Sequence, residues 1–126
     1  MRILIDTHIL IWHLEGDDHL SPARRRLIAD SNNKVLISIA SVWEIAIKLS
    51  NGKLSISKSI DEVVSNVEQS TSSFFTIEPK HLIRVAHLPF HHKDPFDRLI
   101  IAQSLVDGLP IITSDSNFAD YGVELL

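Results

Sequence analysis

The sequence contains no cysteine, which excludes disulfide bonds and metal sites built on thiolates. No apolar run reaches the ~18 residues that a membrane-spanning helix requires, so we expect no association with a membrane. Only four residues are glycine, and they are scattered. The chain therefore has no glycine-rich loop to hold the phosphates of a nucleotide, which argues against Rossmann-like nucleotide binding.

Positive charge is not in excess either. Twelve Lys and Arg residues stand against 16 Asp and Glu, which gives a formal net charge of -4. A protein that coats nucleic acid carries a broad basic field, so this balance disfavours DNA packaging but allows an enzyme with a local basic rim. The first residues lack the apolar region and cleavage site of a signal peptide, and we expect a cytoplasmic protein. A length of 126 residues suits one compact domain, residues 1–126.

Short apolar runs alternate with helical patterns along the chain. We predict strands at residues 3–5, 35–39, 74–77 and 110–113, with a last short strand at 123–126. We predict helices at residues 7–14, 22–28, 41–49, 60–69, 79–87 and 95–107, and a turn or short helix at 117–121. This alternation is typical of the α/β class, in which helices cover both faces of a central parallel sheet, here of four to five strands.

The last long helix has an unusual beginning. Asp94 suits its N-cap, and Pro95 suits its first turn because proline lacks the backbone N–H that a helix start leaves unused. Asp97 then lies on the apolar face of the same helix. A carboxylate directed at a core needs a partner, and no basic residue lies on that face. We therefore expect Asp97 to meet groups from elsewhere in the chain.

Three more acids occupy comparable positions. Asp6 follows the first predicted strand, Asp115 follows the fourth, and Glu44 lies early in the helix after the second. Because the carboxyl ends of parallel strands share one edge of a sheet, we expect these acids to meet Asp97 there. Carboxylates at close range repel one another, and a hard divalent cation such as Mg²⁺ or Mn²⁺ relieves the repulsion. The sequence thus predicts an acidic metal site suited to phosphate chemistry.

Four segments, in this order and spacing, resemble the PIN domain family, and most closely the VapC-type toxins of bacterial type II toxin–antitoxin modules. They are Ile3–Thr7 (ILIDT), Ser41–Lys48 (SVWEIAIK), Asp94–Gln103 (DPFDRLIIAQ) and Thr113–Phe118 (TSDSNF). The similarity covers essentially the whole chain. It implies a three-layer α/β/α PIN-like fold over residues 1–126.

The resemblance also implies a function. It indicates a Mg²⁺- or Mn²⁺-dependent endoribonuclease in which metal-activated water cleaves RNA phosphodiester bonds. The catalytic and metal-binding acids would be Asp6, Glu44, Asp97 and Asp115. A homodimer and a small antitoxin protein that silences the site are implied as well.

Several residues beside these acids have less defined roles. Asp94 is an additional acid that caps its helix and can pair with Arg98. Thr7 and Ser114 can hydrogen-bond the acids or a phosphate, and they can equally cap helices. Asn117 stands where related sequences often carry a further acid, so this chain departs from the family pattern there.

The histidines and tryptophans complete the set of candidates. Seven histidines raise the alternative of a zinc site, but the side chains of the adjacent His91 and His92 would diverge, and no convincing helical His-x-x-x-His pair exists. We expect His91, His92 and Lys93 to line the substrate entrance or to lie in a loop. We expect Trp12 and Trp43 to lie in the core or in an interface.

Structural roles and other functions remain open from the residues alone. Asp6 can cap a helix, Glu44 can form a surface ion pair with Lys48, and Asp115 suits a turn. A haloacid-dehalogenase-like phosphohydrolase also has an aspartate after its first strand, but it requires a second acid where this chain has His8. A catalytically silent module that binds RNA or a protein would not need the four acids.

Overall fold

Four parallel strands form the centre of the computed structural model, which describes residues 1–126. They are β1 (Arg2–Ile5), β2 (Lys34–Ser38), β3 (Ser73–Phe75) and β4 (Ile111–Ile112), in the order β3-β2-β1-β4. The chain winds away from β1 in both directions, since β2 and β3 lie on one side of it and β4 on the other. Ligands of open parallel sheets bind at such a switch point, beyond the carboxyl ends of the strands.

Six α-helices and one 3₁₀-helix join the strands. They are α1 (Thr7–Glu15), α2 (Pro22–Ala29), α3 (Ile39–Ser50), α4 (Ile60–Gln69), α5 (Pro79–Ala86), α6 (Pro95–Asp107) and η1 (Ser116–Tyr121). The predicted cap of α6 is present, since the side chain of Asp94 accepts from the backbone N–H of Asp97. At the start of α4, Ser59 and Glu62 form a capping box. None of the helices has the length and hydropathy that crossing a bilayer requires.

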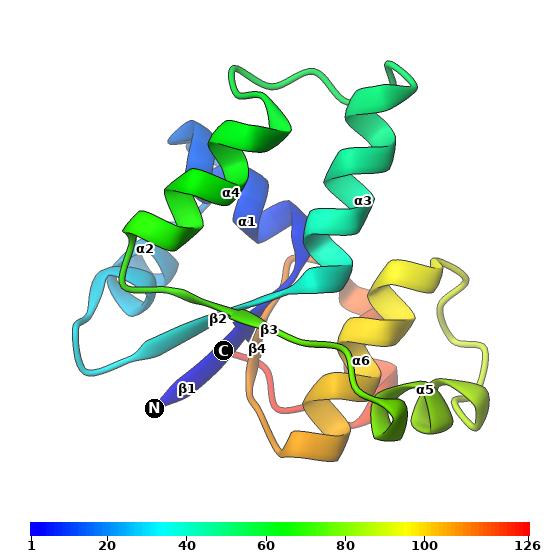
Figure 1. The fold of residues 1–126 in the computed structure, drawn as a ribbon. Coiled ribbons are helices and arrows are strands. Elements are labelled where there is room, and N and C mark those ends of the chain that lie inside the picture. The colour runs from blue at the N-terminus through cyan, green and yellow to red at the C-terminus, as the bar shows by residue number, and fades with distance from the viewer.

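Successive strand residues face opposite helix layers, as the pleat of a strand demands. Ile3, Ile5 and Ile37 pack in an apolar cluster with residues of α1, α2, α3 and α4. Leu4 and Leu36 point the other way and pack with residues of α6. Figure 1 shows α1, α2 and α4 on one side of the sheet and α5 and α6 on the other. The predicted α/β class with a central parallel sheet is thereby confirmed, and the sheet has four strands.

Several predicted boundaries are wrong by one or more residues, and side-chain hydrogen bonds explain them. Helix α3 begins at Ile39 because the Ser38 hydroxyl accepts from the backbone N–H of Ala40 at 3.1 Å and caps the helix there. Strand β3 ends at Phe75 because the next carbonyl, that of Thr76, accepts from the Gln103 side chain instead of a strand. The predicted last strand is reduced to one isolated bridge between residues 111 and 125.

Helix α3 turns its polar stripe inward. Ser41 and Glu44 are buried, whereas Trp43 is 54% exposed and Ile47 is 37% exposed. Trp43 is therefore not a core residue; its ring packs edge-on against Phe96, with 4.9 Å between ring centroids. Trp12, in contrast, packs against the apolar cluster on the α1 side of the sheet. The inward polar stripe directs Glu44 at the edge of the sheet where Asp6 lies.

Candidate metal centre at the carboxyl edge of the sheet

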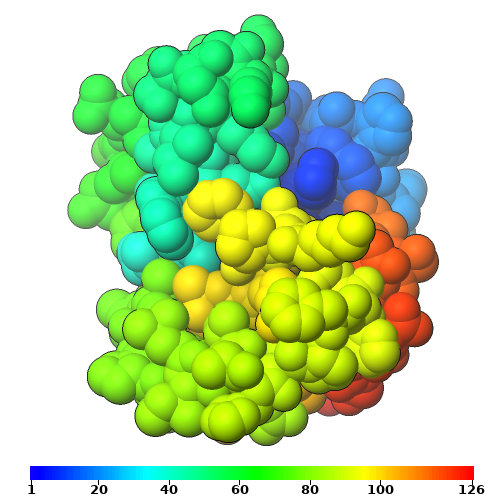
Figure 2. Space-filling model, turned by 90° about the vertical axis from the view of Figure 1, so that its right-hand side faces the viewer, coloured from blue at the N-terminus to red at the C-terminus, as the bar shows by residue number.

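The acidic side chains come from four separate segments at one edge of the sheet. Asp6 lies between β1 and α1, Glu44 lies on α3, Asp94 and Asp97 begin α6, and Asp115 precedes η1. Figure 2 looks onto this edge, where α1 in blue, α3 in teal, the segment before α6 in yellow and the C-terminal segment in orange come together. The predicted convergence of the acids can therefore be examined residue by residue.

Asp6 caps a helix and also belongs to the acidic group at the edge of the sheet. Its Oδ1 accepts from the backbone N–H of Ile9 at 2.9 Å and caps α1, while its Oδ2 accepts from the Thr113 hydroxyl. Burial raises the pKa of the Asp6 carboxyl, although the hydrogen bonds from Thr113 and Ile9 oppose that rise. The Thr113 hydroxyl also accepts from the backbone N–H of Asp115 at 3.0 Å, so one side chain ties Asp6 to the segment of Asp115.

Glu44 is buried with one oxygen unsatisfied. Its Oε2 accepts from Lys48 Nζ at 2.6 Å, as the spacing along the helix allows. Its Oε1 is the one buried side-chain nitrogen or oxygen of the protein that has no hydrogen-bond partner. Buried polar atoms are nearly always paired, so a free carboxylate oxygen beside other acids indicates a ligand position.

Asp97 lies at the centre of the acidic group. One oxygen each of Glu44, Asp94 and Asp97 lie within 4.8 Å of one another. Burial raises the pKa of the Asp97 carboxyl to about 7, with further contributions from the negative charges of Asp94, Asp6 and Glu44. Asp97, which has no basic partner on its own helix, is thus surrounded by other acids.

His92 also contacts this group, and the sequence analysis did not assign it there. Its Nε2 lies 2.7 Å from Oδ2 of Asp115 and 3.1 Å from Oδ2 of Asp97. Atoms of these three residues form a second group within 4.8 Å, so Asp97 belongs to both groups. The residue types gave no signal of this contact, because it depends on how the loop before α6 folds back over Asp115.

The side chains of the remaining predicted neighbours make no hydrogen bond to an acid. The Thr7 hydroxyl is buried and donates to the Ser41 hydroxyl at 3.1 Å. Ser114 is exposed and makes no hydrogen bond to an acid, whereas Thr113 next to it does. Asn117 is exposed, and its backbone N–H donates to Oδ1 of Asp115 at 2.9 Å. Thr113 is therefore a residue of the site that the sequence analysis missed.

The expected pair between Asp94 and Arg98 is wrong. The guanidinium of Arg98 is buried, lies 4.1 Å from the centre of the Phe90 ring and forms no ion pair with an acid. It donates instead to backbone carbonyls, at 2.9 to 3.4 Å, of Val85, Leu88, Pro89 and His92. Arg98 thus fastens the loop that carries His92, and it does not neutralise the acids of the site.

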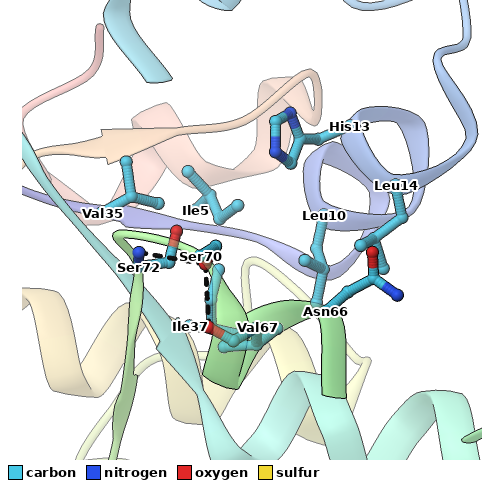
Figure 3. A pocket seen from close by; sticks show the side chains of 10 residues that line it. All are labelled: Ile5, Leu10, His13, Leu14, Val35, Ile37, Asn66, Val67, Ser70 and Ser72. Atoms are coloured by element: carbon cyan, nitrogen blue, oxygen red, sulfur yellow. Dashed lines mark hydrogen bonds between the residues drawn. The ribbon is translucent and has the colours of Figure 1, made fainter. Parts of the chain in front are cut away.

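A cleft of about 290 Å³ between α1 and α3 reaches Glu44. Lys48 and Lys53 lie along it together with Trp12 and His8. The cleft therefore combines two positive charges with aromatic surface beside the acids. A smaller cavity of about 30 Å³ lies between α1, α4 and the sheet, with room for roughly one water molecule, and none of the acids lines it (Figure 3).

The donor set fits a hard divalent cation. Five carboxylates approach one another, and Lys48 is the permanent positive charge that contacts them. Mg²⁺ and Mn²⁺ prefer carboxylate oxygens, whereas structural zinc sites are dominated by histidine and thiolate ligands. With one histidine at the site, the zinc alternative has no support from the ligand set.

Comparison with known proteins places this arrangement in a family. The family model described as PIN domain matches residues 3–124. The chain belongs to the PIN domain family. The resemblance found from the four sequence segments is confirmed, and the nuclease interpretation is favoured over a haloacid-dehalogenase-like phosphohydrolase.

Solved structures share the fold at low sequence identity. A chain of VapBC2 from Rickettsia felis, bound to a DNA fragment from the promoter, gives a TM-score of 0.74 at 16% identity, covering 100% of this chain and 98% of that one. FitAcB from Neisseria gonorrhoeae gives a TM-score of 0.70 at 18% identity, covering 98% of this chain and 96% of that one. A toxin–antitoxin complex from Klebsiella pneumoniae gives a TM-score of 0.61 at 24% identity, covering 93% of this chain and 90% of that one. A search of curated proteins gives no match.

Proposed function

We propose that this PIN domain, residues 1–126, is a metal-dependent endoribonuclease and the toxin of a toxin–antitoxin module. Nuclease activity is typical of the family. The observation that carries the proposal is the meeting of buried and half-buried acids around Asp97, beside a Glu44 oxygen that has no partner. As a toxin acting on cellular RNA, the protein would work in the cytoplasm.

In this proposal four acids hold Mg²⁺ or Mn²⁺, namely Asp6, Glu44, Asp97 and Asp115, and Asp94 is an accessory acid. A bound cation of this kind lowers the pKa of its water and stabilises negative charge at phosphorus. Asp6 is kept in place by its hydrogen bonds from Ile9 and Thr113. The burial of Glu44 and Asp97 keeps competing water away from the carboxylates and strengthens their electrostatic interactions.

The cleft beside Glu44 supports RNA as the substrate. Lys48 and Lys53 offer positive charge to phosphates, and Trp12 offers a face on which an unpaired base can stack. A single-stranded or exposed segment of RNA fits this arrangement better than a duplex, because the bases of a duplex are stacked on one another.

Cleavage of a defined single-stranded RNA tests the proposal. We expect cleavage with Mg²⁺ or Mn²⁺, none with EDTA, and a loss of at least about 100-fold for Asp97→Ala. Asp107→Asn is the matched control, since Asp107 lies at the other end of α6 and contacts Lys80 and His81 instead. Full cleavage in EDTA, or by Asp97→Ala, would contradict the proposal; a folded wild-type protein that binds RNA without cleaving it would support the silent binding module.

The similar solved structures support a small antitoxin protein as the partner, because toxin–antitoxin complexes occur among them. We expect expression of the wild-type chain to arrest bacterial growth and expression of Asp97→Ala to leave growth unchanged. A small protein encoded beside this chain should restore growth and elute with it as a complex. Growth arrest by Asp97→Ala would separate toxicity from the acidic site.

We also propose that a second copy of the chain is a partner, so that the protein forms a homodimer. Ile39, Trp43 and Ile47 form an exposed apolar stripe on α3, of the kind that marks protein interfaces. Light scattering on the purified chain should give twice the monomer mass, and Ile47→Lys should shift the protein toward the monomer. A wild-type monomer at micromolar concentration would contradict this part of the proposal.

A further inference from the structure

The loop between α5 and α6 brings His92 to the acidic site in a fixed orientation. The backbone N–H of His92 donates to the Tyr121 hydroxyl at 2.8 Å, and that hydroxyl donates to the carbonyl of Pro89 at 2.8 Å. The His92 ring lies edge-on to Phe118, with 6.0 Å between ring centroids. The buried Arg98 fastens the same loop, so these contacts fix the backbone that carries His92, while Phe118 packs against its ring.

The hydrogen bonds of the ring define which nitrogen carries the proton. The backbone N–H of Asp94 points at Nδ1 of His92 at 3.1 Å, and a backbone N–H can only donate. Nδ1 must therefore accept, which places the ring proton on Nε2. That nitrogen faces Oδ2 of Asp115 at 2.7 Å and Oδ2 of Asp97 at 3.1 Å, so the Nε2–H donates to the carboxylates.

This arrangement is the reverse of a metal-ligating histidine. A histidine that ligates a metal offers an unprotonated nitrogen to the ion and donates from its other nitrogen to a neighbouring acceptor. His92 accepts a hydrogen bond at Nδ1 and donates one from Nε2 to the acids. It therefore hydrogen-bonds to the carboxylates and does not ligate the cation.

We infer that His92 is a positioning residue of the metal centre, whose Nε2–H orients the carboxylates of Asp115 and Asp97 toward a shared divalent cation. The inference rests on the proposed function. Groups that hydrogen-bond to metal ligands fix the direction of the ligand lone pairs, and their loss commonly weakens metal binding by roughly 10- to 100-fold. Asp115 would be affected most, because its Oδ1 is already committed to the backbone of Asn117.

Mn²⁺ binding to the purified protein, measured by calorimetry or by the loss of the free Mn²⁺ resonance signal, tests the inference without recourse to activity. We expect His92→Ala to raise the Kd for Mn²⁺ by roughly 10- to 100-fold. His92→Gln, which keeps an amide donor near the position of Nε2, should restore binding to within about threefold of wild type. His91→Ala is the matched control, since His91 packs edge-on against Tyr121 and touches none of the acids.

The outcomes separate this inference from the proposed function. Mn²⁺ binding that is equally tight or tighter in His92→Ala would overturn the inference and leave the metal-dependent nuclease standing. A wild-type protein that binds no Mn²⁺ would overturn both. A ¹⁵N spectrum of the histidine rings offers an independent readout: a proton on Nε2 of His92 in the metal-free protein supports the inference, and a proton on Nδ1 alone contradicts it.

Discussion

Two histidine–aspartate pairs in this protein are built alike. In one, Nδ1 of His81 accepts from the backbone of Glu78 at 3.0 Å and Nε2 lies 2.8 Å from Asp107. In the other, Nδ1 of His92 accepts from a backbone N–H and Nε2 lies 2.7 Å from Asp115. A backbone donor sets the same tautomer in both, and the proton faces a carboxylate in both.

The charges around the two pairs differ. Lys80 lies 2.8 Å from the second oxygen of Asp107. Although burial alone would raise the pKa of Asp107, the hydrogen bonds from Lys80 and His81 outweigh it and hold that pKa below its usual value. Around His92 the acids outnumber the cations, and the pKa of Asp97 rises to about 7. The pair of His81 and Asp107, called the balanced pair because Lys80 offsets its charge, joins α5 to α6. The pair of His92 and Asp115, called the unbalanced pair, lies among acids and can accept a cation.

Removal of the balanced pair should give the largest loss of stability. His81 is fully buried, so His81→Ala leaves a cavity and removes the partners of Glu78 and Asp107. We expect the free energy of unfolding in urea to fall by roughly 3 kcal/mol. His92→Ala, at the half-buried edge, should cost less than half as much. Equal losses would show that both pairs serve the fold in the same way.

A divalent cation should stabilise only the unbalanced region. At a free Mn²⁺ concentration of about 100 times its Kd, binding to the folded state adds about 2.7 kcal/mol to the stability. Thermal unfolding should shift upward on addition of Mn²⁺ in wild type and in Asp107→Asn, and the shift should be absent in Asp97→Asn. A shift that persists in Asp97→Asn would place the ion elsewhere.

The pH dependence of the metal-free protein should have opposite signs at the two carboxyls. The folded pKa of Asp97, about 7, lies above the ordinary value of 3.8, so between these values the folded state holds a proton that the unfolded state has released. Stability contributed by this group is therefore present below about pH 4 and is lost as the pH rises through about 7. For Asp107, with a lowered pKa, stability is lost as the pH falls through the acid range.

Urea unfolding in EDTA at about pH 5 and about pH 8 measures the first of these effects. Asp97→Asn should remove the fall in the free energy of unfolding between these two pH values. The variant should therefore be more stable than wild type at the higher pH. If the free energy of unfolding of Asp97→Asn changes between the two pH values as much as that of wild type, the ionised Asp97 carboxyl is not destabilised by its neighbours.

The smallest effect should come from Lys80. Its side chain is about half exposed, so its ion pairs with Asp107 and Glu78 are screened by water. We expect Lys80→Ala to lower the free energy of unfolding by less than any of the changes above and to leave Mn²⁺ binding unchanged. A loss comparable to that of His81→Ala would mean that the lysine, and not the histidine, dominates the balanced pair.

Features that depend on near neighbours in the chain were predictable. The α4 capping box, the cap and first turn of α6, and the alternation of Ile3, Leu4 and Ile5 between two apolar layers follow from residues a few positions apart. The strand ends were harder to predict, because side chains such as that of Gln103 compete for the last backbone groups. The same limit applies to Trp43, whose exposure depends on which side of α3 the sheet lies.

By itself the sequence determined the α/β order of elements and the positions of Asp6, Glu44, Asp97 and Asp115 at strand ends and helix starts, because period, caps and turns are local properties. Only the tertiary structure decided the contact of His92 with an acid 23 residues away, the unpaired oxygen of Glu44 and the role of Arg98 in fastening the loop. These depend on how distant segments pack against one another, and the proton of His92 takes its direction from that packing.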